Sequence, residues 1–259
     1  MNNTFSIKRF NLLFKKHTIE NANLYLLSAG VVFGLMFITL GLTAYNLGGV
    51  VPPDLQTIIF VVFMILSGSI FTSISYASLG DKRKAIPMLT LPASHLEKYL
   101  VVWIYSFIIF QLVFVGSFYL ADSIVLNFGN PAAAHAQLLN LFDARNYAFI
   151  AFVIYTVLHA FTFWGAIYFE KLHFIKTSFV FFIFFMVFTI LNQPVLGLMV
   201  NKKLLLMNMP FDSLRFMDNG HKQNIEQQID FIYYHLAAVI VTAMLLWCSA
   251  FFRLKEKEV

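Results

Sequence analysis

The stretch GDKRKAIPMLTLPASHLEKYL, at residues 80–100, separates two apolar runs that are each long enough to cross a membrane. It begins with a cluster of basic residues, and membrane proteins keep positively charged loops on the cytoplasmic side. Pro87 and Pro92 prevent one continuous helix, because proline lacks a backbone N–H and disfavours helix in the residue before it. Ser94 and Glu97 then form the capping-box pattern that starts a helix. Residues 80–98 are therefore expected to form a braced cytoplasmic loop that leads into the next helix.

The composition places the whole chain in a membrane. Hydrophobic residues make up 59% of it, charged residues only 12%, and the mean hydropathy is +0.75, whereas about a quarter of a soluble domain is charged. The net charge of +5 does not indicate nucleic-acid binding, because the basic residues lie between apolar runs and sort by side of the membrane. The single cysteine, Cys248, excludes a disulfide framework or a thiolate metal cluster within the chain.

The predicted fold class is all-α integral membrane, a single domain over residues 1–259 with six transmembrane helices and both termini in the cytoplasm. This orientation places 13 of the 18 Lys and Arg residues on the cytoplasmic side, in agreement with the positive-inside rule. A long extracytoplasmic loop is expected at 201–230. The predicted spans are 24–45, 55–79, 99–125, 147–169, 177–200 and 231–252.

An amphipathic helix is predicted ahead of the first span, at residues 5–18. Ile7, Phe10, Leu13 and Phe14 share one helical face, and basic residues occupy the other, as is typical of a helix lying at the membrane surface. The alternative is the charged flank of a signal peptide. However, the apolar run that follows is longer than the 7 to 15 residues of the apolar segment in a signal peptide, which favours an uncleaved anchor.

Two further features concern the spans themselves. Gly30 and Gly34 form a GxxxG pattern, which lets helix backbones approach closely, either between two subunits or between two spans of one chain. Pro194 lies near the end of the fifth span, after Asn192 and Gln193. It predicts either a helix interrupted near the outer surface or an ordinary proline kink.

Catalytic motifs are nearly absent from the sequence. It contains no phosphate-binding loop, no HExxH and no GxSxG pattern. His159 is the only histidine well inside a predicted span, where a hydrogen-bonded structural role is the commoner one, and Asp122 is the only acid inside a span. We therefore expect neither an enzyme nor a bound metal or cofactor in this chain.

Together, the basic amphipathic helix, the six spans and the sequence LTLPASHLEKYL at 89–100 resemble the membrane subunits of type-2 ATP-binding cassette transporters. The resemblance implies a permease of the bacterial inner membrane that works as a homodimer or heterodimer and binds a separate cytoplasmic ATPase. ATP and Mg²⁺ would be held by that partner. It further implies that residues 5–18 form a surface elbow, that the loop after the second span carries a coupling helix, and that short helices lie between spans 5 and 6.

The resemblance also assigns the contact with the ATPase to the loop after the second span. Leu89 and Leu91 would supply apolar anchors. His95, Glu97 and Lys98 would determine how the loop aligns with the ATPase. In the alternative, Ser94 and Glu97 only cap the third span and the basic residues only fix the topology. The predicted coupling residues are Leu89, Leu91, Pro92, Ser94, His95, Glu97 and Lys98.

Two functions of other classes stay open at the level of the sequence. One is a non-transporting scaffold or sensor whose outer loop, 201–230, binds a ligand or a partner protein. The other is an intramembrane enzyme with His159 in its site, which the scarcity of clustered polar residues in the spans disfavours. The sequence leaves the transported substrate open.

Overall fold

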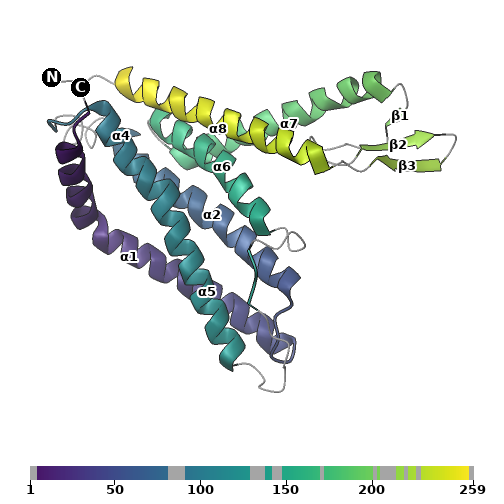
Figure 1. The fold of residues 1–259 in the computed structure, drawn as a ribbon, viewed down its shortest axis with the longest axis horizontal. Helices are drawn as coiled ribbons and strands as arrows, with labels where there is room; N and C mark the ends of the chain where they lie inside the picture. Colours follow the sequence, from purple (N-terminus) through teal and green to yellow (C-terminus); the bar gives the residue numbers. More distant parts are fainter. Residues whose placement is uncertain are drawn as a thin grey trace.

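The computed structural model describes residues 5–80, 91–128, 138–141, 148–169, 172–200, 203–204, 214–218, 221–225 and 229–256. Six helical segments in these ranges are long and apolar enough to cross a membrane (Figure 1). The third of them is built from three consecutive pieces, α4, a π-helical turn η1, and α5. The helices are α1 (Ile7–Asn46), α2 (Pro53–Gly80), α4 (His95–Trp103), η1 (Ile104–Ile109), α5 (Phe110–Phe128), α6 (Ala148–Tyr168), α7 (His173–Val200) and α8 (Ile229–Glu256).

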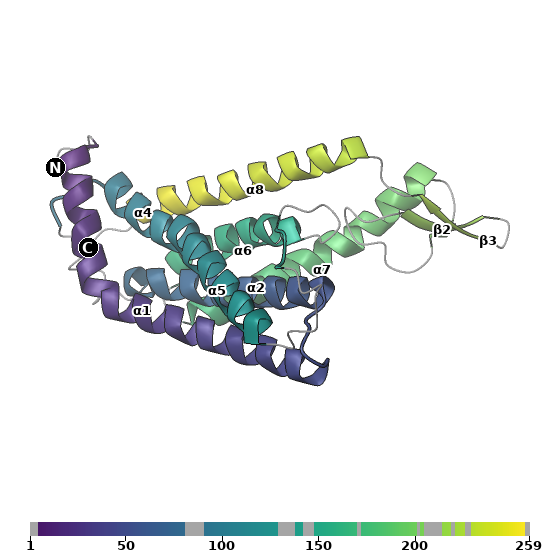
Figure 2. The same cartoon turned by 60° about the horizontal axis from the view of Figure 1, so that its bottom comes forward.

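The six predicted spans each coincide with one of these segments, and the differences lie at the ends. The largest difference is at the N-terminus, where the predicted amphipathic helix 5–18 and the span 24–45 form one helix, α1. Residues 19–23 contain no glycine or proline that would stop a helix. The first turns of α1 nevertheless stand at an angle to the rest (Figures 1 and 2).

The fifth span is not interrupted. Helix α7 continues through Pro194 to Val200, so the expected break near the outer surface is wrong and the alternative of a proline within a helix is correct. The fixed φ of proline is compatible with helix, and its costs are the loss of one backbone hydrogen bond and the crowding of its ring against the carbonyl four residues earlier.

A small antiparallel sheet lies in the region 201–230, where a long extracytoplasmic loop was expected. Its strands, β1 (Lys203–Leu204), β2 (Leu214–Asp218) and β3 (His221–Ile225), pair in that order. The fold is therefore all-helical only in its membrane-spanning part. The resemblance implied short helices between spans 5 and 6, but the described residues of this region form strands. The sheet lies beyond the end of α7, away from the bundle (Figures 1 and 2).

Two apolar cores hold the bundle together, and α6 contributes to both. The first lies between α1, α2, α5 and α6, where Phe60 contacts Phe114 and Phe118 edge to face at ring-centroid distances of 5.3 and 5.0 Å. The second lies between α4, α6 and α8 and contains Tyr99 and Leu254. This sharing explains why α6 is the most buried of the six segments.

Both termini and the start of α4 lie at the same end of the bundle, at the left of Figure 1, and the sheet lies at the other end. An even number of crossings requires this arrangement. The assignment of that end to the cytoplasm stays a prediction from the charge distribution.

Candidate functional site

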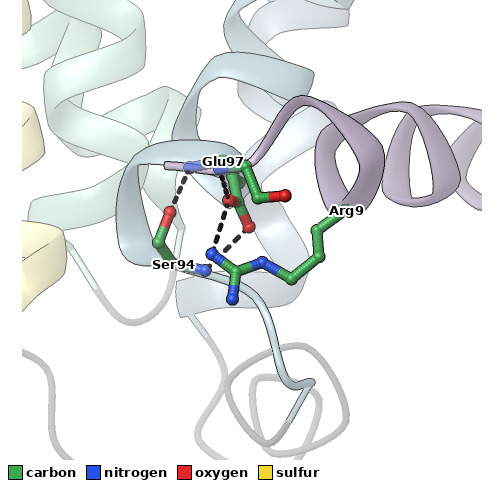
Figure 3. Close-up of polar contacts among 4 residues, drawn as sticks. Arg9, Ser94 and Glu97 are labelled. Atoms are coloured by element: carbon green, nitrogen blue, oxygen red, sulfur yellow. Dashed lines mark hydrogen bonds and ion pairs between the residues drawn. The ribbon is translucent and has the colours of Figure 1, made fainter. Parts of the chain in front are cut away.

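The loop after the second span and the N-terminal helix meet at one buried carboxylate, that of Glu97 (Figure 3). Its Oε1 accepts a hydrogen bond from the backbone N–H of Ser6 at 2.7 Å and another from the Arg9 guanidinium at 3.1 Å. Its Oε2 accepts from the backbone N–H of Ser94 at 2.9 Å. The carboxylate therefore joins the start of α1, the loop and the start of α4.

Ser94 and Glu97 are joined by a second hydrogen bond, in which the side chain of Ser94 is the acceptor. Its Oγ accepts a hydrogen bond from the backbone N–H of Glu97 at 3.2 Å, so the two residues form the reciprocal capping box that the sequence predicts. Two of the N–H groups that helix formation leaves without partners are thereby satisfied inside the protein.

The donors around Glu97 favour its ionised form. Glu97 lies in the first turn of α4, ahead of the predicted span 99–125. Burial alone raises the pKa of its carboxyl, but the N–H groups of Ser6 and Ser94, together with the Arg9 guanidinium, outweigh burial and lower the pKa below its usual value. The junction is therefore held by a carboxylate at neutral pH.

Sequence reasoning found Ser94 and Glu97 but missed Ser6 and Arg9. A capping box is a local pattern over four residues, whereas the contacts of Ser6 and Arg9 with Glu97 join positions about 90 residues apart. The sequence offers one signal, an acidic residue in the loop and several basic residues in the N-terminal helix. It does not show which of the basic residues pairs with the acid.

The structure separates the predicted coupling residues into two groups. Ser94, Glu97 and Lys98 are buried within this chain, so they are not available for direct contact with another protein. Pro92 is exposed and His95 half-buried, while Leu91 is half-buried beside a groove along α1. Leu89 lies outside the described residues.

The predicted apolar face of the elbow packs partly against the bundle. Phe14 contacts Tyr105 of η1, with ring centroids 5.0 Å apart, and Phe10 contacts Phe14 at 6.1 Å. Leu13 is half-buried, but Ile7 is 68% exposed. The interfacial position of this segment stays a prediction.

Gly30 and Gly34 have no close neighbour in the described part of the chain, since a Cβ on either would meet nothing within 4 Å. Packing between spans of one chain therefore does not explain the GxxxG pattern, and the dimer contact stays untested. The close approaches are made by Gly68 and Gly165 instead. A Cβ on Gly68 would overlap the Tyr155 ring, and one on Gly165 would overlap the Thr177 side chain.

His159 lies at the centre of a polar network inside the bundle and is fully buried. The indole N–H of Trp247 donates to its Nδ1 at 3.2 Å, so the neutral ring carries its proton on Nε2 and can donate to Ser106 Oγ at 2.9 Å. Ser106 Oγ in turn donates to the carbonyl oxygen of Val102 at 2.9 Å. Both ring nitrogens are thus hydrogen-bonded inside the bundle, which is the structural role that the sequence favours for this histidine.

The π-helical turn η1 is part of this network. The N–H of Phe110 bonds to the carbonyl of Tyr105, five residues back, instead of to that of Ser106. The Tyr155 hydroxyl donates to the carbonyl oxygen of Ser106 at 2.7 Å. A side chain of α6 thereby satisfies a backbone acceptor that the π-turn leaves open in the third span.

Within the described residues, no group of three or more His, Cys, Asp or Glu side chains could hold a metal ion. Asp122 of α5 is fully buried beside the first core.

No protein-family model, no curated protein sequence and no solved structure matches this chain. The chain is therefore characterised by its composition, its fold and the two polar junctions at Glu97 and His159.

Proposed function

We propose that this protein is the permease subunit of an ATP-binding cassette transporter, working in export or in mechanical transmission. The observation that carries the proposal is the Glu97 junction, which ties the loop after the second span to the N-terminal helix and to the third span. The family resemblance of residues 89–100 assigns contact with an ATPase to the same loop.

A loop that transmits displacement must be fixed to the helices that it moves. Four hydrogen bonds join Glu97, Ser94, Ser6 and Arg9, and hydrogen bonds to a charged group are stronger than those between neutral groups. A push on the loop at 91–94 would therefore act on α1 and α4 together. Stiffness of this kind is what a coupling element requires and what a slack connection between two spans would lack.

The proposed assembly contains two permease subunits and two ATPase subunits in a bacterial inner membrane. ATP and Mg²⁺ belong to the ATPase in this proposal. The surface that remains for contact with the ATPase consists of the exposed residues of the loop and of the first turn of α4, including Pro92 and the 40% exposed Leu96. Ser94 and Glu97 act indirectly, by holding that surface in place.

Co-purification and ATPase stimulation test the proposal. The tagged protein, extracted from its native membrane, should retain a stoichiometric ATPase. Leu89→Asp, Leu91→Asp and Leu96→Asp should each abolish the stimulated hydrolysis while the variant still inserts. Leu172→Asp is the matched control, because Leu172 is 65% exposed and lies in the loop after the fourth span, on the same predicted side. Full binding and stimulation in all three loop variants would contradict the proposal.

A scaffold or sensor is the second candidate, and the sheet β1–β3 favours it. Folded structure beyond the bundle offers a surface to a ligand or partner protein on the side opposite the termini. A protein of this kind would purify without an ATPase, so the same co-purification distinguishes the two functions.

A further inference from the structure

A groove of about 900 Å³ runs along α1, with α2 on one side and the third span on the other. This volume lies within the range of ligand-binding pockets, about 300 to 1,000 Å³. The walls come from helices long and apolar enough to cross a membrane, so the groove lies where lipid molecules are the solvent.

Most of the groove has apolar walls, formed by residues that include Leu24, Val31, Leu35, Phe63, Phe71 and Phe114. Three of the four serines that also line it have hydroxyl protons already engaged within their own helices. Ser28, Ser67 and Ser75 donate their hydroxyl protons to the carbonyl oxygens of Leu24, Phe63 and Phe71, within their own helices. This part of the groove is therefore suited to a hydrocarbon chain.

One end of the groove is polar and carries more positive than negative charge. It lies toward the N-terminus of α1 and is lined by Lys16, His17, Glu20, Asn21, Tyr25 and Lys98.

Lys98 is the notable member of this group, because its side chain is almost fully buried and still lines the groove. Lys16 and Glu20 form an exposed ion pair at 3.7 Å, and such a pair contributes little by itself. The lining therefore holds two ammonium groups against the one carboxylate of Glu20, and this excess of positive charge attracts an anion.

The length of the apolar part matches one leaflet of a bilayer. From Leu24 to Leu35 the rise of α1 is about 17 Å, at 1.5 Å per residue. Half of a hydrocarbon core of about 30 Å is about 15 Å. Charge at one end and apolar walls over one leaflet are the layout of a single phospholipid, with its head at Lys98 and its chains alongside Val31.

We propose that this groove holds one anionic phospholipid, taken from the leaflet at the N-terminal end of α1. Its phosphate contacts Lys16 and Lys98, and an acyl chain lies against α1 between Leu24 and Leu35. A second copy of the chain fits less well, since α7, which is largely exposed, carries no acidic residue to complement Lys98. The proposal does not depend on an ATPase partner.

Lipid titration of the purified full-length protein tests the proposal. Binding of phosphatidylglycerol and of phosphatidylcholine with identical acyl chains would be measured by native mass spectrometry. Phosphatidylglycerol should bind about tenfold more tightly. Lys16→Gln and Lys98→Gln should each weaken it about fivefold, the effect expected when one basic contact with an anionic lipid is lost. Lys16 is exposed, so Lys16→Gln keeps the test valid if Lys98→Gln fails to fold.

Two control variants separate the groove from general effects. Lys8→Gln removes the same charge from the same helix but outside the groove, and it should change the affinity less than twofold. Val31→Trp should fill the groove and weaken both lipids at least fivefold, whereas Ile38→Trp, which is outside the groove and similarly exposed, should not.

Several results would overturn the lipid site. One is equal affinity for the two lipids, and another is an equal effect of Lys8→Gln and Lys16→Gln. A third is a Val31→Trp variant that dissociates a dimer without changing lipid binding, because the groove would then be a subunit interface.

Discussion

Replacing Glu97 by Gln tests whether its carboxylate holds the N-terminal helix, the loop and the third span together. The amide keeps one oxygen acceptor, but its NH₂ group must face an N–H donor of Ser6, Arg9 or Ser94. At least one buried hydrogen bond to a charged group is lost, which costs about 1.5–3 kcal/mol. The ion pair with Arg9, which is 33% exposed, adds at most about 1 kcal/mol. The expected loss is about 3 kcal/mol.

Thermal unfolding in detergent, followed by tryptophan fluorescence, measures this loss. For a chain of this size about 3 kcal/mol corresponds to a decrease in Tm of roughly 6–12 °C. Glu256→Gln is the matched control, because Glu256 also pairs with an arginine, Arg253, at 3.0 Å, but its side chain is 64% exposed. That control should shift Tm by less than about 1–2 °C, since exposed pairs contribute little. Equal Tm shifts for Glu97→Gln and Glu256→Gln would refute the reasoning.

The pH dependence gives a second measurement of the same site. The pKa of Glu97 is lowered in the folded protein, so its contribution is fully present above the unfolded-state value of about 4.3. It is lost as pH falls through the folded-state pKa. The difference in stability between wild type and Glu97→Gln should therefore be constant near neutral pH and shrink in acid, and a difference that grew in acid would contradict the assignment.

The remaining predictions concern packing, the buried histidine and the topology. Gly165→Ala should lower the free energy of unfolding by about 1–3 kcal/mol, because the new methyl group overlaps Thr177. Gly30→Ala should cost nothing in the monomer. Equal Tm values for the two variants would show that α6 and α7 can separate freely. His159→Phe should cost about 1–2 kcal/mol, because Trp247 and Ser106 lose their partner, and an unchanged Tm would show that the network contributes nothing to stability. Reporter fusions should place one set of sites in the cytoplasm and another outside, and an external C-terminal fusion would overturn the six-span topology. The expected cytoplasmic sites follow residues 18, 90, 174 and 257, and the external ones follow residues 52, 136 and 215.

Features that depend on neighbouring residues were predictable. The spans follow from long apolar runs, and the start of α4 follows from the Ser94–Glu97 pattern, which the structure confirms. The separate elbow helix was not correct, because the polar residues at 19–23 are compatible with helix even though they interrupt the apolar pattern. The loss of the apolar pattern at 19–23 predicts that the chain passes from the membrane interior to its surface there. A helix can continue across that boundary without interruption.

Features that depend on distant residues were not predictable from a single sequence. Nothing in the GxxxG spacing distinguishes Gly30, which faces open space, from a glycine such as Gly165 that lies against another helix. The sheet is an exception, since it had a usable local signal. The dipeptide Asn219-Gly220 between β2 and β3 is the strongest short hairpin pattern, and the register that pairs Asp218 with His221 is the one that a two-residue loop gives.

The π-turn in the third span has a consequence for how the sequence can vary. A turn of this kind contains one residue more than an α-helical turn. Because the wide turn absorbs this residue, deleting one residue between Ile104 and Ile109 would restore an α-helix without rotating α5 relative to α4. Phe110, Phe114 and Phe118 would keep their places in the first core, and Tyr99 its place in the second. What the π-turn adds is therefore the open backbone acceptor at Ser106 that the Tyr155 hydroxyl contacts.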